Sequence, residues 1–177
     1  MLLTLTFAVC LATVLARCPV PSAVEKGLRF QECRPGQPNY TLKVLNLTVT
    51  DLRGSQKYPV DLSQPLMVNI VVANHGRIVR DILSDTTVQV YTSVLWFPCA
   101  WRTLPTLGLL SNIRGCVGCP IQQGITKLTM PLYPSTYRAI ISMLSSGTAY
   151  AVTTVARDGD DPAVELSCLR IEGLIDV

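Results

Sequence analysis

Short runs of apolar and β-branched residues, separated by clusters of turn residues, make up most of the chain. Apolar residues at helical spacing are almost never sustained over three turns, so the pattern favours strands over helices. Asn74-His75-Gly76 and the acidic segment 158–162 are typical of turns between strands. An all-β fold follows. The pattern predicts strands at residues 27–33, 41–50, 65–73, 86–97, 126–132, 139–144, 149–156 and 164–171.

Seven or eight strands in a chain of this length suit a two-sheet β-sandwich, because each of two facing sheets needs one apolar face. One segment departs from the alternation. Residues 100–118 contain Pro105, Gly108 and Gly115 but keep a series of large apolar side chains. Long ordered loops frequently carry function, so we expect this apolar loop to do so.

Residues 1–16 are typical of a secretory signal peptide. Their apolar stretch has the length of a signal-peptide core and falls short of the roughly 18–20 residues that a membrane-spanning helix requires. Val14 and Ala16 are the small residues expected before the cleavage site. Cleavage there predicts a single mature domain over residues 17–177, in which no later stretch is long and apolar enough to span a bilayer.

Cleavage also removes Cys10 and leaves six cysteines, an even number that is typical of disulfide-bonded secreted proteins. Cys116 and Cys119 have the C-x-x-C spacing of zinc and redox sites. A second pair of zinc ligands and a βαβ setting are both missing from the sequence, so structural disulfides are favoured. The six cysteines are Cys18, Cys33, Cys99, Cys116, Cys119 and Cys168.

Two N-glycosylation sequons begin at Asn39 and Asn46, and neither has proline in the middle position. Together with the signal peptide they predict a secreted or lysosomal glycoprotein. Asn46 lies inside an expected strand, so its use requires that the outward face of that strand present it.

Composition gives little support to catalysis or to nucleic-acid binding. His75 is the only histidine, it lies in a turn, and no G-x-S-x-G nucleophile elbow is present. Asp158, Asp160 and Asp161 do not follow an EF-hand pattern and predict a solvated turn. The net charge of +3 comes from scattered Lys and Arg, unlike the clustered charge of a nucleic-acid-binding protein. We expect no catalytic residue, no metal site and no cofactor.

The chain is unusually apolar for a secreted protein, with 49% hydrophobic and only 15% charged residues. An ordinary packed core is one explanation of this excess. Trp96, Phe97 and Trp101 beside Cys99 favour a second explanation, in which the sandwich encloses an apolar ligand.

Four segments carry a resemblance to a known family: Cys33 after the first strand, LWFPC at 95–99, GCVGCPIQQG at 115–124 and ELSCLRI at 165–171. In the order of these elements, from about Phe30 onward, the chain resembles the ML lipid-recognition family. Residues 132–176 are most similar to its ganglioside-activator branch, whose members are non-enzymatic cofactors of a lysosomal hexosaminidase. The CPIQ stretch is also similar to the sterol-carrying branch.

The resemblance implies an immunoglobulin-like β-sandwich whose sheets separate to admit lipid chains into a cavity between them, with no catalytic residues. It also implies a disulfide between Cys33 and Cys168, which would join the first strand to the last. The family pattern has more cysteines in the loop that follows Cys99 than this chain offers. The partners of the remaining four cysteines stay open, and a tight Cys116–Cys119 loop is one alternative.

Alternation along the strands gives candidates for the lipid cavity, and the apolar loop gives candidates for membrane contact. We expect a protein that extracts a glycolipid or phospholipid from a membrane and presents it, with a lysosomal hydrolase as a further partner. Two alternatives are a sterol carrier of the same fold and a secreted sandwich that binds a protein through an exposed apolar patch. The cavity candidates are Val68, Ile70, Val90, Val94, Trp96, Phe97, Ile140 and Leu144, and the membrane-loop candidates are Trp101, Leu104 and Leu107.

Overall fold

A computed structural model describes residues 18–34, 40–94 and 96–177. The expected signal peptide at 1–16 and the sequon at Asn39 lie outside the described residues. Strands dominate the described chain, and its three helical segments are all too short to cross a membrane. The elements are η1 (Ser22–Val24), β1 (Arg29–Glu32), β2 (Leu42–Asp51), β3 (Val60–Asp61), β4 (Leu66–Asn74), β5 (Ile82–Thr92), β6 (Ala100–Thr103), β7 (Ile113–Arg114), β8 (Gly124–Leu132), η2 (Pro134–Tyr137), α1 (Arg138–Ile141), β9 (Thr148–Asp158) and β10 (Glu165–Asp176).

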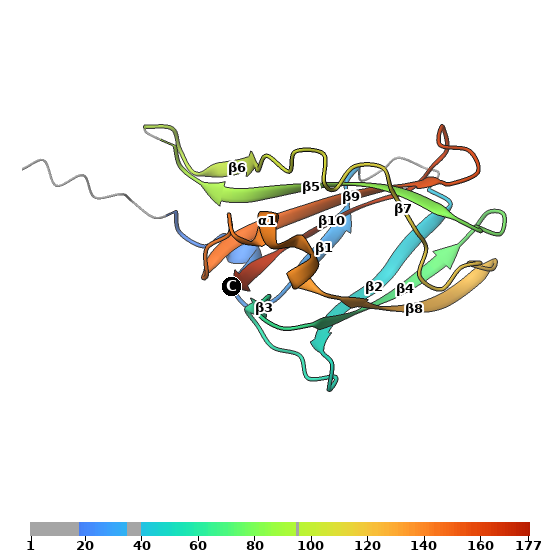
Figure 1. Cartoon of the computed structure of the whole chain (residues 1–177), viewed down its shortest axis with the longest axis horizontal. Helices are drawn as coiled ribbons and strands as arrows, with labels where there is room; N and C mark the ends of the chain where they lie inside the picture. The colour runs from blue at the N-terminus through green and yellow to red at the C-terminus, as the bar shows by residue number, and fades with distance from the viewer. Residues whose placement is uncertain (1–17, 35–39, 95) are drawn as a thin grey trace, which may run out of the picture.

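The strands form two sheets that face each other, as in immunoglobulin-like sandwiches (Figure 1). The large sheet has the strand order β1-β10-β9-β5-β6, with β3 added beside β10 and β7 beside β5. The small sheet has the order β2-β4-β8. Paired strands are antiparallel except β3 and β10, which are parallel. The predicted all-β, two-sheet sandwich is confirmed.

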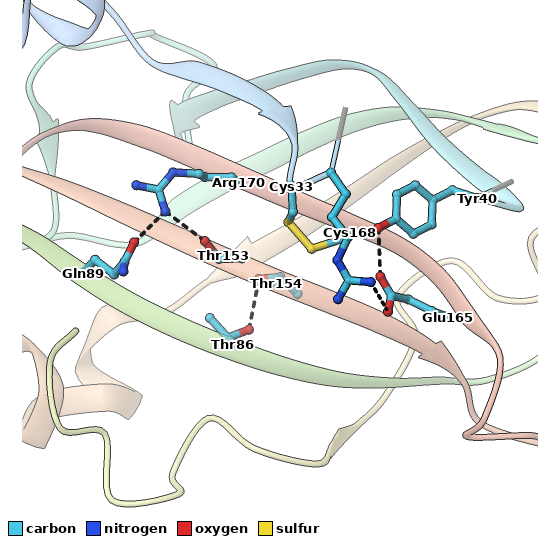
Figure 2. Close-up of a disulfide and its surroundings, with 10 residues drawn as sticks. Cys33, Tyr40, Thr86, Gln89, Thr153, Thr154, Glu165, Cys168 and Arg170 are labelled. Carbon is cyan, nitrogen blue, oxygen red and sulfur yellow. Dashed lines mark hydrogen bonds and ion pairs between the residues drawn. A yellow bond between two sulfur atoms is a disulfide. The ribbon is translucent and has the colours of Figure 1, made fainter. Parts of the chain in front are cut away.

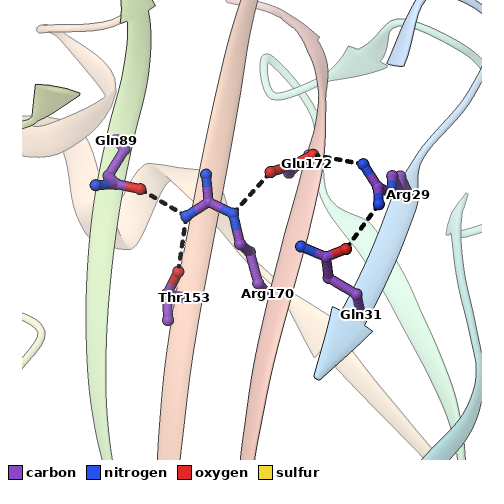
Figure 3. Close-up of polar contacts among 6 residues, drawn as sticks. All are labelled: Arg29, Gln31, Gln89, Thr153, Arg170 and Glu172. Carbon is purple, nitrogen blue, oxygen red and sulfur yellow. Dashed lines mark hydrogen bonds and ion pairs between the residues drawn. The ribbon is translucent and has the colours of Figure 1, made fainter. Parts of the chain in front are cut away.

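A row of polar side chains crosses one face of the large sheet and identifies it as the outer face (Figure 3). Arg170 on β10 donates to Oε1 of Gln89 on β5 over 2.6 Å and to Oε1 of Glu172 over 2.7 Å. Glu172 also pairs with Arg29 of β1, with 3.8 Å between the nitrogen and the oxygen. Ile82, on the opposite face, packs against buried residues of the small sheet. The charged groups thus pair with one another on the outer face, and the inner face is left mainly to apolar groups.

Three segments differ from the sequence expectation. Residues 139–144, expected as a strand, lie instead in the helical segment of η2 and α1 and the turn that follows. Pro134 starts this segment with a backbone angle that suits a helix, and Ile140 is the buried residue of the short α1. The strand expected at 86–97 is β5, which begins at Ile82 and ends at Thr92. The expected loop at 100–118 includes β6 and β7, which pair with the edge of β5.

Three disulfides tie loops and the start of the described chain to the rest of the fold. Cys33, directly after β1, is bonded to Cys168 of β10, with 5.3 Å between their Cα atoms (Figure 2). This is the pair that the family resemblance implies. Beside it, the Tyr40 hydroxyl donates to Oε1 of Glu165 over 2.9 Å. The other two bonds are Cys18–Cys99 and Cys116–Cys119.

Candidate functional site

Buried apolar side chains between the sheets form two clusters that are separated along the strands. The first lies where β4 turns into β5, and the second lies where η2 and α1 pack on the large sheet. Along β5, Ile82 contacts the first cluster and Val88 belongs to the second. Ser84 and Thr86 lie between them on the same face of the strand. The first cluster consists of Leu42, Val72, Val79, Ile121 and Leu166, and the second of Val88, Leu110, Ile140 and Tyr150.

The inner face of the small sheet is apolar along β8 and the middle of β4, but these side chains are not fully buried. Along β8, side chains that point outward are exposed and those that point inward are half-buried. Leu128 and Met130 pair across to Ile70 and Val68 of β4, which are also half-buried. In a closed sandwich such side chains would be packed against the facing sheet. Apolar surface between the sheets is therefore still accessible to solvent.

The large sheet adds half-buried apolar groups and one hydroxyl pair to the same inner space. Val152 of β9 and Ile171 of β10 share a face with Val88 and stay half-buried. On that face the hydroxyl oxygens of Thr86 and Thr154 are 3.0 Å apart and share a hydrogen bond (Figure 2). Because the two hydroxyls satisfy each other, the lining is mainly hydrocarbon. An acyl chain or another elongated apolar group matches such a lining.

Five of the predicted cavity residues lie on or against the inner faces. Val68 and Ile70 line the half-open stretch. Val90 and Leu144 contact the second cluster, and Ile140 is inside that cluster with 4% of its surface exposed. Ile140 is therefore a packed core residue and not a cavity-lining one, because the helix that carries it rests on the large sheet.

The other three predicted cavity residues do not line the inner space. Val94, Trp96 and Phe97 lie in the connection between β5 and β6, which projects from one end of the large sheet (Figure 1). All three are exposed. Apolar character placed them among the cavity candidates, but the hairpin carries them away from the facing sheet.

The predicted membrane-loop residues also separate in the structure. Trp101 lies in β6 on the outer face, packs against Tyr91 with 5.2 Å between ring centroids, and has the Arg170 guanidinium 5.1 Å from its ring. Leu104 contacts the second buried cluster. Leu107 is 89% exposed. Trp101 and Leu104 are thus parts of the packed fold, which corrects the expectation that they face a membrane.

A surface hollow lies at the end of the sandwich where residues 51–66 connect β2 to β4. Its outer part has a volume of about 290 Å³ and is lined by polar loop residues, among them Asp51, Lys57 and Gln64. An inner part shares these three residues and reaches Val49 and Leu66. Val49 belongs to the inner face of the small sheet. Polar groups therefore adjoin the apolar inner face at this end.

A buried carboxylate lies at the end of β9, where the sequence pattern predicts only a solvated turn. Asp158 is 2% exposed, and its Oδ2 accepts a hydrogen bond from the Arg77 guanidinium over 2.6 Å. Burial raises the pKa of Asp158, but the backbone N–H of Asp160 and the Arg77 guanidinium outweigh it and hold the pKa below its ordinary value. Asp160 and Asp161 are exposed as expected. The prediction of a turn is correct, but the first carboxylate of the turn, that of Asp158, is part of the packed fold.

We expect Asp158→Asn to lower the free energy of unfolding by about 2–3 kcal/mol near neutral pH, because a buried charge-assisted hydrogen bond is lost. The Asp158 carboxylate stabilises the fold above its unfolded-state pKa, and this contribution is lost as the pH falls through the lower folded-state pKa. The difference between variant and parent should therefore shrink below about pH 4. Urea unfolding at several pH values measures it, with Asp160→Asn as the exposed control. A difference that persists unchanged in strong acid would contradict the assignment.

No protein-family model and no curated protein sequence matches the chain. The solved structures that match this chain include the following two. A Niemann-Pick type C2 protein from the Japanese carpenter ant is 11% identical, with a TM-score of 0.44 over 84% of this chain and 99% of that chain. The C-terminal domain of wzt is 9% identical, with a TM-score of 0.43 over 88% of this chain and 81% of that chain. Likeness at this level does not bear on function.

Proposed function

We propose that this protein binds a lipid between its two sheets and transfers it without catalysis. The half-buried apolar side chains on both inner faces carry the proposal. An acyl chain placed between them removes its own surface and the surface of both linings from water. Burial contributes about 0.8 kcal/mol per CH₂ group, so long chains provide affinity without any specific polar contact.

The lipid we propose is a glycolipid or phospholipid that the protein extracts from a membrane and presents with its headgroup in solvent. This is the activity of the ganglioside-activator branch of the ML family, which the sequence resembles. Peripheral contact with a membrane is part of this proposal, and a lysosomal hydrolase is the proposed acceptor. Three disulfides support an oxidising compartment, secreted or lysosomal. Asn46 is exposed on β2, where a glycan would meet solvent.

Native mass spectrometry of the secreted protein, followed by organic extraction, tests the proposal. We expect a co-purifying two-chain lipid whose fragments identify the headgroup. A single sterol would assign the protein to the sterol carriers instead. Protein that carries no lipid and takes none from vesicles would contradict lipid binding and favour the partner-binding alternative.

A pair of variants on β4 localises the lipid. Val68 points inward and Val71 points outward from the same strand, and both are half-buried. Val68→Phe fills part of the space between the sheets, so we expect several-fold less bound lipid than in the parent protein. Val71→Phe adds the same volume on the outer face and should leave the bound lipid unchanged. Equal retention by both variants would place the lipid elsewhere.

A further inference from the structure

The connection between β5 and β6 holds two aromatic rings in solvent. Trp96 is 82% exposed and Phe97 is 51% exposed. Their rings stack on each other, with 5.9 Å between centroids and 29° between planes. Neither ring belongs to a buried cluster of the described chain. With the exposed Val94 they form what we call the aromatic tip, at the projecting end of the large sheet (Figure 1).

The aromatic tip follows directly on the paired ends of β5 and β6, which form its base. Directly below it, β5 and β6 pair over four residues of each strand. Tyr91 and Trp101 are paired in that register and pack against each other. The Cys18–Cys99 disulfide joins the base to the segment before η1. The base of the tip is therefore held by strand pairing, ring packing and a disulfide.

Acidic residues are missing from the whole stretch of sequence that contains the tip. Residues 86–157 contain none of the twelve Asp and Glu of the chain but five of its fifteen Lys and Arg. This stretch includes most of β5 and all of β6, η2 and α1. Arg114 and Arg157 are neutralised by Asp81 and Asp85, which lie outside the stretch. The remaining cations are Arg102, Lys127 and Arg138.

Two of these cations lie on the part of the fold that carries the tip. The Arg102 guanidinium carbon is 5.8 Å from the centroid of the Phe97 ring. Arg102 is paired with Val90, which packs in the same cluster as Ile140 of α1. Arg138 is the first residue of α1 and is exposed. Neither guanidinium forms an ion pair within the described residues.

We propose that the aromatic tip inserts into the headgroup region of a bilayer that contains anionic phospholipid. Trp and Phe side chains are favoured at this depth, and Arg side chains are attracted to the negative surface. A protein interface normally surrounds its apolar centre with a polar rim, whereas the charged residues within the stretch 86–157 are all cations. The inference rests on the membrane contact proposed above and names its site and the charge of the lipid.

The test uses the secreted protein with Trp101→Phe, which leaves Trp96 as the only tryptophan. On vesicles of phosphatidylcholine with phosphatidylserine, we expect the Trp96 emission to shift to the blue and to be quenched by brominated phosphatidylcholine. In co-sedimentation, the Trp96→Ala/Phe97→Ala variant of the parent protein should bind these vesicles about tenfold or more weakly. Arg102→Gln/Arg138→Gln should reduce binding to the level seen with phosphatidylcholine alone, as should high salt.

Ile125→Ala is the matched control, since Ile125 is 73% exposed at the start of β8, beside the first buried cluster and away from the tip. Its vesicle binding should equal that of the parent. Undiminished binding by the tip variant, or an unquenched Trp96 on bound vesicles, would overturn the proposal. A blue shift of the Trp96 emission with a protein partner, but not with vesicles, would also overturn it. Val68→Phe should lose lipid but still bind vesicles, so tip insertion and lipid binding fail separately.

Discussion

Replacing Cys33 and Cys168 together with serine should lower the free energy of unfolding by about 5 kcal/mol, because the bond closes a loop of 135 residues in the unfolded chain. Such a loss is comparable to the whole stability of many domains of this size. The bond also joins β1 to β10, so its removal frees an edge strand of the large sheet. Chemical denaturation followed by far-UV circular dichroism measures the loss.

The Cys116→Ser/Cys119→Ser variant is the control for this prediction. That disulfide spans only 3 residues, so the same entropic reasoning gives a loss of about 1–2 kcal/mol. Equal losses for the two double variants would show that loop closure is not the source of stabilisation. A larger loss for the short loop would point to local packing, since Cys116 and Cys119 both contact the first buried cluster.

The second large effect is a difference in stability loss between a residue in the packed part of the interior and one in the half-open part. Leu166 is 1% exposed in the first cluster, so Leu166→Ala should cost about 3–4 kcal/mol by leaving a cavity. Met130 points inward from β8 but is only half-buried, so Met130→Ala in lipid-free protein should cost about 1 kcal/mol or less. Its removal leaves no new closed cavity.

Urea unfolding of lipid-free protein measures both variants, and the same experiment on lipid-loaded protein adds a second comparison. A lipid between the sheets stabilises the folded state by mass action, and it would contact Met130 directly. Met130→Ala should therefore lose more stability in the loaded protein than in the lipid-free one. If Met130→Ala costs as much as Leu166→Ala without lipid, the sheets are closed at that position and the proposed lipid site is wrong.

The strands of the small sheet were predictable because their signal is local. Alternation at 41–50, 65–73 and 126–132 corresponds to β2, β4 and β8 within one or two residues. The same alternation correctly predicts that Val68 and Ile70 point inward, since successive side chains on a strand point to opposite faces. Residues 139–144 misled the prediction because a short apolar run has no clear period, and packing of Ile140 decides its conformation.

The sequence does not distinguish exposed from packed residues of the same type that lie close together in the chain. Trp96 and Trp101 are five residues apart and equally apolar, yet one is exposed at the aromatic tip and the other is packed on the outer face. Asp158 and Asp160 differ in the same way, since one is buried against Arg77 and the other is exposed. In each pair the register of a hairpin decides which side chain meets a neighbour.

The sequence by itself determined the all-β class and the two-layer arrangement, because hydrophobic period and turn chemistry act over a few residues. It also supplied the cysteines, the apolar excess and the acid-free stretch at 86–157. Only the tertiary structure decided that two buried clusters leave half-buried apolar faces between the sheets, and that Trp96 and Phe97 project while Trp101 packs. Those features depend on contacts between residues far apart in the chain, which no local pattern specifies.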